Sequence, residues 1–160
     1  MGRAQLIERP ITPQALRYVL AHLWPRGVEE LRLLGVTKDG AYSRFLSYAR
    51  HPWGHTPCVL EFDGVPAVVF GVSGDDGGAF TWFQATDAFE QYAGEITRYI
   101  RREAKAYTVP LFIYSVCVHP DTARWFRVLG FAPTEKVREL PSGALLRQFE
   151  RVRADVRAAA

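Results

Sequence analysis

Three side chains in this sequence are of types that could exchange a proton with a substrate: Glu30, Tyr114 and His119. Carboxylates, phenols and imidazoles are groups that enzymes use as general acids and bases. Each of the three also has a structural interpretation, as a helix carboxylate, a core tyrosine and a loop histidine before Pro120. We favour the structural interpretation and keep Glu30, Tyr114 and His119 as the catalytic candidates if the protein is an enzyme.

Other reactive residues do not form a recognisable site. His51 and His55 have the spacing of a metal-binding pair, but their Pro/Gly-containing loop offers no third convergent ligand, so we expect no metal. Cys58 and Cys117 lie far apart and outside any CxxC motif, which excludes a disulfide framework or a thiolate zinc site and favours a reducing compartment. No serine lies in a nucleophile-elbow pattern.

The composition is that of a folded domain without an electrostatic preference for nucleic acid. The chain has 160 residues, of which 48% are hydrophobic and 13% aromatic, enough for one core. We therefore expect a single domain over residues 1–150, followed by an Ala/Arg-rich tail over 151–160. The formal charge of +3 comes from 20 basic and 17 acidic residues without a run of like charges, so nucleic acid is not indicated as a partner.

The hydropathy pattern contains no targeting or membrane segment. No apolar stretch of signal-peptide length follows the first residues, and none approaches the roughly 20 apolar residues of a membrane-spanning helix. We therefore expect a cytoplasmic protein in the cell that makes it, with no membrane partner.

The first half of the chain predicts a strand, three helical segments and then a group of strands. A short strand is expected over residues 4–9, and Thr12 has the position of an N-cap before a helix with Pro13 in its first turn. Helical spacing of apolar residues continues over 28–34 and 41–49. An antiparallel meander is expected next, with strands over residues 58–62, 65–72 and 79–85 and turns at Asp63-Gly64 and at the glycine-rich run 74–78.

The second half predicts alternating helices and strands. A long amphipathic helix is expected over 88–107, with Asp87 and Glu90 arranged like a capping box at its start. The nearly continuous apolar run 111–118 predicts a strand that is buried on both faces. A helix over 122–129 that ends at Gly130, and a last strand over 143–150, complete the order; together these elements predict an α+β fold with a mixed, mostly antiparallel twisted sheet flanked by helices.

This order of elements resembles the GNAT (N-acetyltransferase-like) superfamily over roughly residues 4–150. The sharpest local similarity is VHPDTARWFRVLGF at 118–131, which resembles the segment where GNAT proteins carry an Asn, a helix and a Leu-Gly-Phe ending. A phage-encoded branch, related to the internal virion proteins of T7-like phages, is similar in further places. These are RPITPQAL at the start, the pair Glu30-Leu31, AVVFGV at 67–72 and TWFQATDAFE at 81–90.

The sequence departs from the GNAT pattern at the positions where that resemblance implies chemistry. GNAT enzymes bind the CoA pyrophosphate with a glycine-containing loop at the start of the long helix, whereas this chain has QATDAFE at 84–90, without glycine and with Asp87 and Glu90. The tyrosine that many GNAT enzymes use as general acid, four residues before the Gly of Gly-Phe, is replaced by Phe126. The asparagine position of the family falls on His119.

These departures favour a non-enzymatic GNAT-fold scaffold, a phage virion or assembly component that acts through contacts with other proteins, including other virion components. Trp53, in the loop HPWGH, is a candidate contact residue, and the virion is then a second location besides the cytoplasm. On this hypothesis we expect no cofactor and no acetyl-CoA in the usual site. The alternative is an N-acyltransferase that uses acetyl-CoA with an atypical phosphate-binding site. A small regulatory or nucleic-acid-binding module is a third interpretation, and the oligomeric state is left open.

Overall fold

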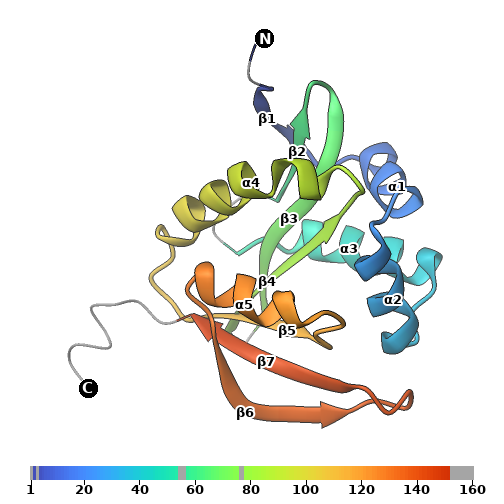
Figure 1. Ribbon diagram of the computed structural model, residues 1–160, viewed down its shortest axis with the longest axis vertical. Coiled ribbons are helices and arrows are strands. Elements are labelled where there is room, and N and C mark those ends of the chain that lie inside the picture. Colours follow the sequence, from blue (N-terminus) through green and yellow to red (C-terminus); the bar gives the residue numbers. More distant parts are fainter. Residues whose placement is uncertain (1, 3, 54–56, 76–77, 152–160) are drawn as a thin grey trace.

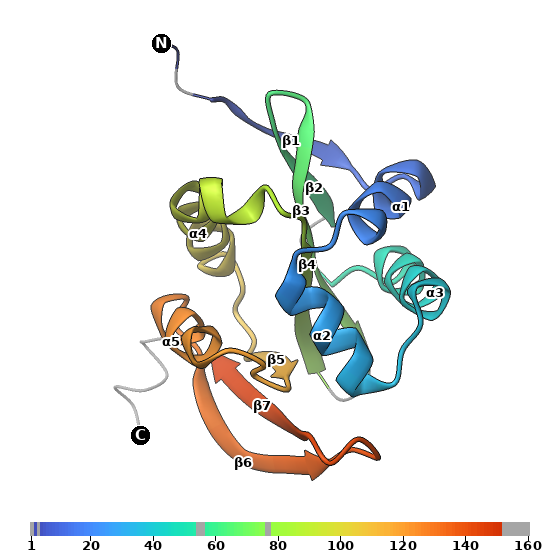
Figure 2. The ribbon, with the colours of Figure 1, turned by 45° about the vertical axis from the view of Figure 1, so that its right-hand side comes forward.

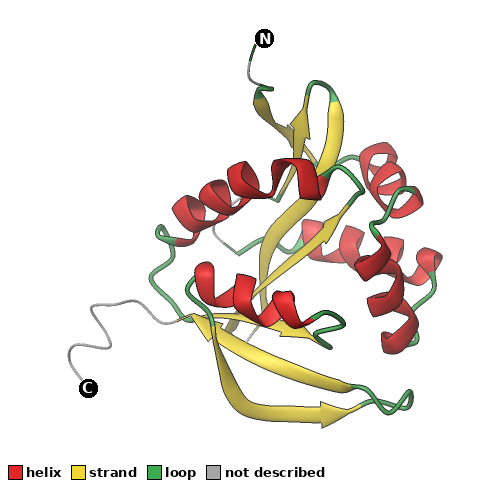
Figure 3. Ribbon diagram, viewed as in Figure 1, coloured by secondary structure: helices red, strands yellow, loops and turns green. Residues whose placement is uncertain are grey.

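A seven-stranded sheet with five helices forms the described part of the protein (Figure 1, Figure 3). The computed structural model describes residues 2, 4–53, 57–75 and 78–151. In chain order the elements are β1 (Leu6–Pro10), α1 (Pro13–Ala21), α2 (Pro25–Leu34), α3 (Lys38–Arg50), β2 (Cys58–Phe62), β3 (Val65–Asp75), β4 (Gly78–Ala85), α4 (Phe89–Ala104), β5 (Leu111–Ser115), α5 (Pro120–Val128), β6 (Ala132–Glu139) and β7 (Leu145–Arg151).

The sheet has the order β1-β2-β3-β4-β5-β7-β6. All neighbouring strands pair antiparallel except β4 and β5, which are parallel. The predicted α+β fold class, the meander of β2, β3 and β4, and the interior position of the strand that begins at Leu111 are therefore confirmed.

Alternating residues of the central strands send their side chains into two separate cores. Val59 and Val69 pack with α1 and α3 on one face, whereas Leu60, Val68 and Phe70 pack on the other face with residues of α4 and α5. This is the consequence of the two-residue period of a strand, which places neighbouring side chains on opposite faces. Figure 2 shows α4 and α5 on one side of the sheet and α1, α2 and α3 on the other.

Two local predictions from residue type are confirmed in detail. The turn between β2 and β3 has positive φ angles at Asp63 (49°) and Gly64 (78°), the conformation that suits a two-residue hairpin. Thr12 is the N-cap of α1, and its Oγ accepts a hydrogen bond from the Ala15 N–H at 3.0 Å. None of the helices in the described ranges is long and apolar enough to cross a membrane.

The structure corrects the prediction for the last third of the chain. The segment Ala132–Glu139 forms the edge strand β6, for which the sequence predicted no strand, because its side chains are mostly exposed and give no apolar alternation. The strand predicted over 111–118 ends at Ser115 and is not buried on both faces, since Tyr114 is 48% exposed. The helix predicted over 88–107 is shorter and spans Phe89–Ala104. Residues 152–160 of the predicted tail lie outside the described residues.

Candidate functional site

The two parallel strands in the middle of the sheet pair over a short distance and then separate. β4 and β5 are partners at Ala79 with Leu111 and at Phe80 with Phe112, and no further pairing between them is present in the described chain. β4 nevertheless continues to Ala85 and β5 to Ser115. Between Phe80 and Ala85 the backbone of β4 therefore has an edge on the β5 side without a strand partner, whereas the Ala85 carbonyl accepts the Trp24 N–H at 3.1 Å. Unpaired backbone groups of this kind are available to a ligand.

A cavity of about 510 Å³ lies at this separation. Its walls come from β4 and β5, from α2 and α3 on one face of the sheet, and from the starts of α4 and α5 on the other. Most of the lining is apolar or aromatic, including Phe45, Tyr48, Trp82 and Trp125. A largely apolar cavity with a few polar groups is the usual form of a small-molecule site.

Glu30 is the ionisable group with the clearest electrostatic perturbation in this cavity. It is half-buried on α2, and burial raises its pKa from 4.5 to about 7, against a smaller opposing effect of the hydrogen bond from Ser115. The Ser115 Oγ lies 3.4 Å from the Glu30 Oε1 and accepts the Cys117 N–H at 3.0 Å. A carboxyl group with a pKa near the working pH can both take up and release a proton, which is what general base catalysis requires.

Thr81 contributes a second polar group that lacks a protein partner. Its side chain lies in the cavity wall, on β4 directly after the last residue paired with β5, and it is 7% exposed. Within the described part of the chain, the buried Thr81 Oγ has no hydrogen-bond partner. Because buried hydroxyl groups are normally hydrogen-bonded, this one is suited to contact a bound molecule.

The other two catalytic candidates lie in different surroundings. Tyr114 is on β5 and lines the cavity, and its Oη accepts a hydrogen bond of 2.9 Å from the Gln148 Nε2. Its side chain is exposed, so it is not the core tyrosine that the sequence predicted. His119 is the N-cap of α5, where its Nδ1 accepts the Asp121 N–H at 3.2 Å. The structure thus brings Glu30 and Tyr114 to one cavity and gives His119 a capping role beside it.

Phe126, four residues before Gly130, has a buried phenyl ring that can donate no proton. Its ring is 1% exposed and packs against Phe131 and Phe149. It also lines the cavity. A departing group in this cavity therefore receives no proton from this position.

The start of α4 differs from the predicted capping box. Ala88 is the N-cap, and no side-chain hydrogen bond caps it in the described structure. The Thr86 Oγ accepts the Ala88 N–H at 3.2 Å and donates to the Pro66 carbonyl at 2.8 Å. Asp87 and Glu90 are exposed, so their effect on an anion at this helix end is electrostatic and does not come from occupying the N–H groups.

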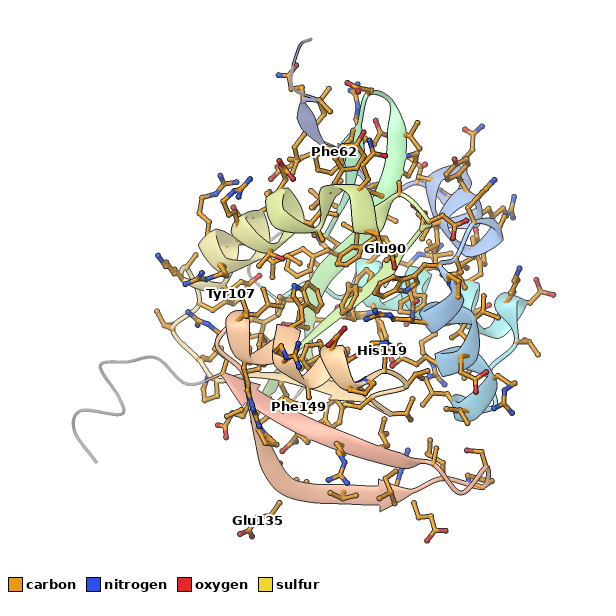
Figure 4. The ribbon with its side chains drawn as sticks, in the orientation of Figure 1. Phe62, Glu90, Tyr107, His119, Glu135 and Phe149 are labelled. Atoms are coloured by element: carbon orange, nitrogen blue, oxygen red, sulfur yellow. The ribbon has the colours of Figure 1, made fainter. Side chains whose placement is uncertain are left out.

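An aromatic cluster with members from α4, α5, β4 and the residue before α2 forms part of the cavity wall. Trp125 contacts Phe83 and Phe89 at ring-centroid distances of 5.0 and 5.5 Å, and Phe89 contacts Trp24 at 4.8 Å. Figure 4 shows Glu90 at the start of α4 and His119 at the start of α5, both at the ends of these helices that lie nearer α2 in this view. An anionic ligand approaching α4 thus meets aromatic rings and carboxylates in place of a glycine loop.

Neither His51 nor the exposed Trp53 lines this cavity. His51 is the C-cap of α3, with its Nδ1 2.9 Å from the Ser47 carbonyl oxygen, and His55 lies outside the described residues. Trp53 is 38% exposed. Its ring lies so close to Gly74 that a Cβ at Gly74 would be 2.0 Å from it.

Sequence reasoning missed Ser115, Thr81 and the arginines of the cavity wall, Arg26 and Arg44. Ser115 and Thr81 lie in apolar strand segments and belong to no sequence motif. That they line a cavity becomes clear only from the structure, where β4 and β5 separate. Arg44 could have been found from its helical spacing, because it precedes Phe45 and lies three residues after Ala41 and four before Tyr48, all of which line the cavity.

The arrangement of the chain is that of the GNAT acetyltransferase fold. A Bordetella pertussis protein assigned to the GnaT acetyltransferase family superposes with a TM-score of 0.68 at 15% identity, over 94% of this chain and 100% of that one. The aminoglycoside acetyltransferase AAC(6')-Ib in complex with coenzyme A gives a TM-score of 0.62 at 14% identity, over 98% and 100% of the two chains.

A spermidine N-acetyltransferase chimera from Vibrio cholerae and hSSAT gives a TM-score of 0.62 at 11% identity, over 92% of this chain and 95% of that one. No protein-family model matches the sequence. A search of curated proteins also found no match. At these identities the structural likeness establishes the fold.

Proposed function

We propose that this protein is an N-acyltransferase that transfers an acyl group from acetyl-CoA to an amine, with Glu30 as the general base. The observation that carries the proposal is the Glu30 carboxyl group in the cavity at the separation of β4 and β5, with its pKa raised to about 7 by burial. The acetyltransferases that share the fold support the same reaction class.

The residues beside the strand separation fit the acyl-donating arm of such a substrate. The unpaired edge of β4 can hydrogen-bond the amide groups of an extended chain, and the free Thr81 hydroxyl group lies next to the last paired residue. The start of α4 does not fit the donor's pyrophosphate in the usual way, because it has no glycine and carries Asp87 and Glu90. The proposal therefore includes an atypical phosphate-binding site.

In the proposed reaction, Glu30 takes the proton that the amine nitrogen loses while its bond to the acyl carbon forms. The C–S bond of the thioester breaks, and the sulfur leaves with the electron pair. Phe126 cannot protonate it. A thiol has a pKa of about 8.5, so its thiolate is a stable enough leaving group to depart without a general acid.

The test is an acetyl-transfer assay over a panel of amines with two variants of neighbouring glutamates. Glu30→Gln should lower kcat/KM by about 100-fold or more, because a positioned base contributes roughly 10²- to 10⁴-fold. Glu29→Gln is the control, because Glu29 accepts a hydrogen bond of 2.9 Å from Arg32 on the same helix and does not line the cavity. Equal activity of both variants would remove Glu30 from the proposed role.

A non-enzymatic scaffold is a second candidate, supported by the glycine-free, acidic start of α4 and by the exposed ring of Trp53. The resemblance to internal virion proteins of T7-like phages supports a phage virion or assembly component that contacts other proteins. Acetyl-CoA at about 100 times its Kd would stabilise the fold by roughly 2.7 kcal/mol, a rise in Tm of about 5 to 10 °C. No rise with millimolar acetyl-CoA, together with detection of the chain in purified particles by mass spectrometry, favours the scaffold.

A further inference from the structure

The charged residues that line the cavity are distributed unevenly between its two sides. Arg26 and Arg44 come from α2 and α3, which lie on one face of the sheet, and Glu30 lies with them. Glu90 and Asp121 come from the starts of α4 and α5 on the other face. Even with Glu30 ionised as a base, two arginines and one carboxylate leave the α2 and α3 side with a net positive charge, whereas Glu90 and Asp121 make the opposite side negative, so an anionic group is favoured beside the arginines.

Arg44 is the residue best placed to bind such a group. It lies on α3 in the stripe of residues that faces the cavity, together with Ala41, Phe45 and Tyr48. The described residues provide no carboxylate partner for it, whereas Arg32, Arg98 and Arg124 each pair with an acidic residue three positions earlier on the same helix. An unpaired guanidinium group beside an apolar wall can form a charge-assisted, bidentate hydrogen bond to a carboxylate or phosphonate.

Arg26 provides a second cation, from α2 and not from α3. Its guanidinium carbon lies 5.2 Å from the centre of the Trp24 ring, and Trp24 contacts Phe89 at the start of α4. Arg26 is therefore near the helix end where the GNAT resemblance places the donor's phosphates. Arg44, on α3, lies on the opposite face of the sheet from α4, so an anion bound there belongs to the other substrate.

We infer that the acyl acceptor is an amine that also carries an anionic group on an apolar body, such as an apolar amino acid, with its anion bound by Arg44. This inference rests on the proposed acyltransferase function and deepens it by naming the substrate class. The apolar body fits the wall formed by Leu31, Leu34, Val36 and Phe45. The amine then lies in the same cavity as Glu30, which takes its proton.

The first test measures binding alone, so that it does not depend on catalysis. Isothermal titration compares L-phenylalanine with phenethylamine, and L-leucine with 3-methylbutylamine, because the members of each pair differ only in the carboxylate. The wild-type protein should bind the amino acids about tenfold more tightly, as expected for one charge-assisted contact. Arg44→Gln should abolish this preference. Arg50→Gln should keep it, because Arg50 is an exposed arginine of α3 like Arg44 but does not line the cavity.

Equal binding of amine and amino acid to the wild type, no measurable binding of either amino acid, or a preference that survives Arg44→Gln would each overturn the inference. A CoA titration shows which substrate Arg44 binds. Weaker CoA binding by Arg44→Gln, with an unchanged preference for amino acids over amines, would mean that Arg44 binds the acyl donor and would overturn the inference. If Arg44-dependent amino-acid binding is present but no acetyl transfer occurs to any amine, the anion site stands and the acyltransferase function fails. If transfer proceeds equally to both members of each pair, the function stands and the acceptor inference fails.

Discussion

Glu30 and Thr81 are polar residues that line the cavity, and each carries a polar group whose burial lowers the stability of the fold. The carboxyl group of Glu30 is desolvated, and the hydroxyl group of Thr81 has no partner in the described structure. Groups that lower stability at a cavity are good candidates for function, since ligand binding can compensate for the cost. We therefore expect that substitutions which remove these polar groups leave stability unchanged or raise it, while they weaken activity or ligand binding.

For Glu30 the prediction concerns pH. The folded-state pKa of about 7 exceeds the ordinary value of 4.5, so the native state holds a proton that the unfolded state releases over this range. The wild type therefore loses stability as the pH rises from 4.5 to about 7, and Glu30→Gln does not. The gain of Glu30→Gln over the wild type should grow by about 1 to 3 kcal/mol between pH 4.5 and pH 8 in urea unfolding. Glu29→Gln should show no such gain, because Arg32 lowers the pKa of Glu29. A pH-independent effect of Glu30→Gln would contradict a buried, titrating carboxyl group.

For Thr81, in β4, the prediction uses Thr86, the residue directly after β4, as a comparison. Thr81→Val removes a hydroxyl group without a partner, so the free energy of unfolding should stay unchanged or rise by about 1 kcal/mol. Thr86→Val removes a hydroxyl group that donates to Pro66 and accepts from Ala88, and it should cost about 1 to 3 kcal/mol. In acetyl-CoA titrations, Thr81→Val should bind more weakly than the wild type. Destabilisation of Thr81→Val as large as that of Thr86→Val would show that the Thr81 hydroxyl group has a partner in the free protein.

At the scale of elements, the contact of β3 with β4 fixes one wall of the cavity. Gly71 is the cross-strand neighbour of Trp82, and a Cβ at Gly71 would lie 2.6 Å from the Trp82 Cζ2. The indole is held in place because the Trp82 Nε1 donates to the Ser73 Oγ at 3.0 Å, and the Ser73 Oγ donates to the Tyr48 carbonyl at 2.8 Å. The wall therefore depends on a glycine that lets an aromatic ring lie on its backbone.

Gly71→Ala should destabilise the protein by about 1 to 3 kcal/mol, because the ring must leave this position. Gly94→Ala is the matched control, since Gly94 is exposed on α4 and its Cβ would only contact the Arg98 Nη1 at 3.8 Å. That substitution should stabilise the helix by about 0.5 to 1 kcal/mol. Urea unfolding followed by tryptophan fluorescence reports both effects, and a Gly71→Ala variant as stable as the wild type would contradict the packing of Trp82 on Gly71.

At the scale of the whole molecule, the negative charge lies on the side of the cavity where an acyl donor's phosphates would bind in a GNAT enzyme. Glu90 is in the first turn of α4 and Asp121 in the first turn of α5. Carboxylates at helix starts stabilise the helices through the macrodipole, but they oppose an anionic ligand at the same place. We therefore expect Glu90 and Asp121 to stabilise their helices and to weaken the binding of any anionic group at these helix starts.

Glu90→Gln should therefore strengthen acetyl-CoA binding by about two- to fivefold, consistent with a helix-end charge effect of roughly 0.3 to 1 kcal/mol. The gain should be largest at low ionic strength, because salt screens exposed charges. Glu135→Gln on the edge strand β6 serves as the control for a change of net charge, since Glu135 is exposed and does not line this cavity. Affinity that does not respond to Glu90→Gln at low salt would place the phosphates away from α4.

The sequence by itself determined most elements and their order. The helix after Thr12 follows from apolar spacing and its N-cap, and the Phe89–Ala104 helix follows from apolar spacing alone. The meander follows from two-residue alternation around Asp63-Gly64. These features depend on neighbours within a few residues, which is why they can be predicted. The edge strand Ala132–Glu139 was missed because an exposed strand needs no apolar pattern and exists through its pairing with β7.

Only the tertiary structure decided which residues form the candidate site. The sequence named Glu30, but its raised pKa depends on burial at the separation of two strands, and its hydrogen-bond partner Ser115 lies 85 residues further along the chain. Tyr114 has the sequence context of a core residue, yet the end of β5 exposes it. Thr81 carries no motif at all, and the helical spacing of Arg44 assigns it to a face of α3 without showing that this face lines a cavity. Desolvation and cavity shape are sums over residues distant in sequence, so they are fixed when the sheet and its helices assemble and cannot be read from local patterns.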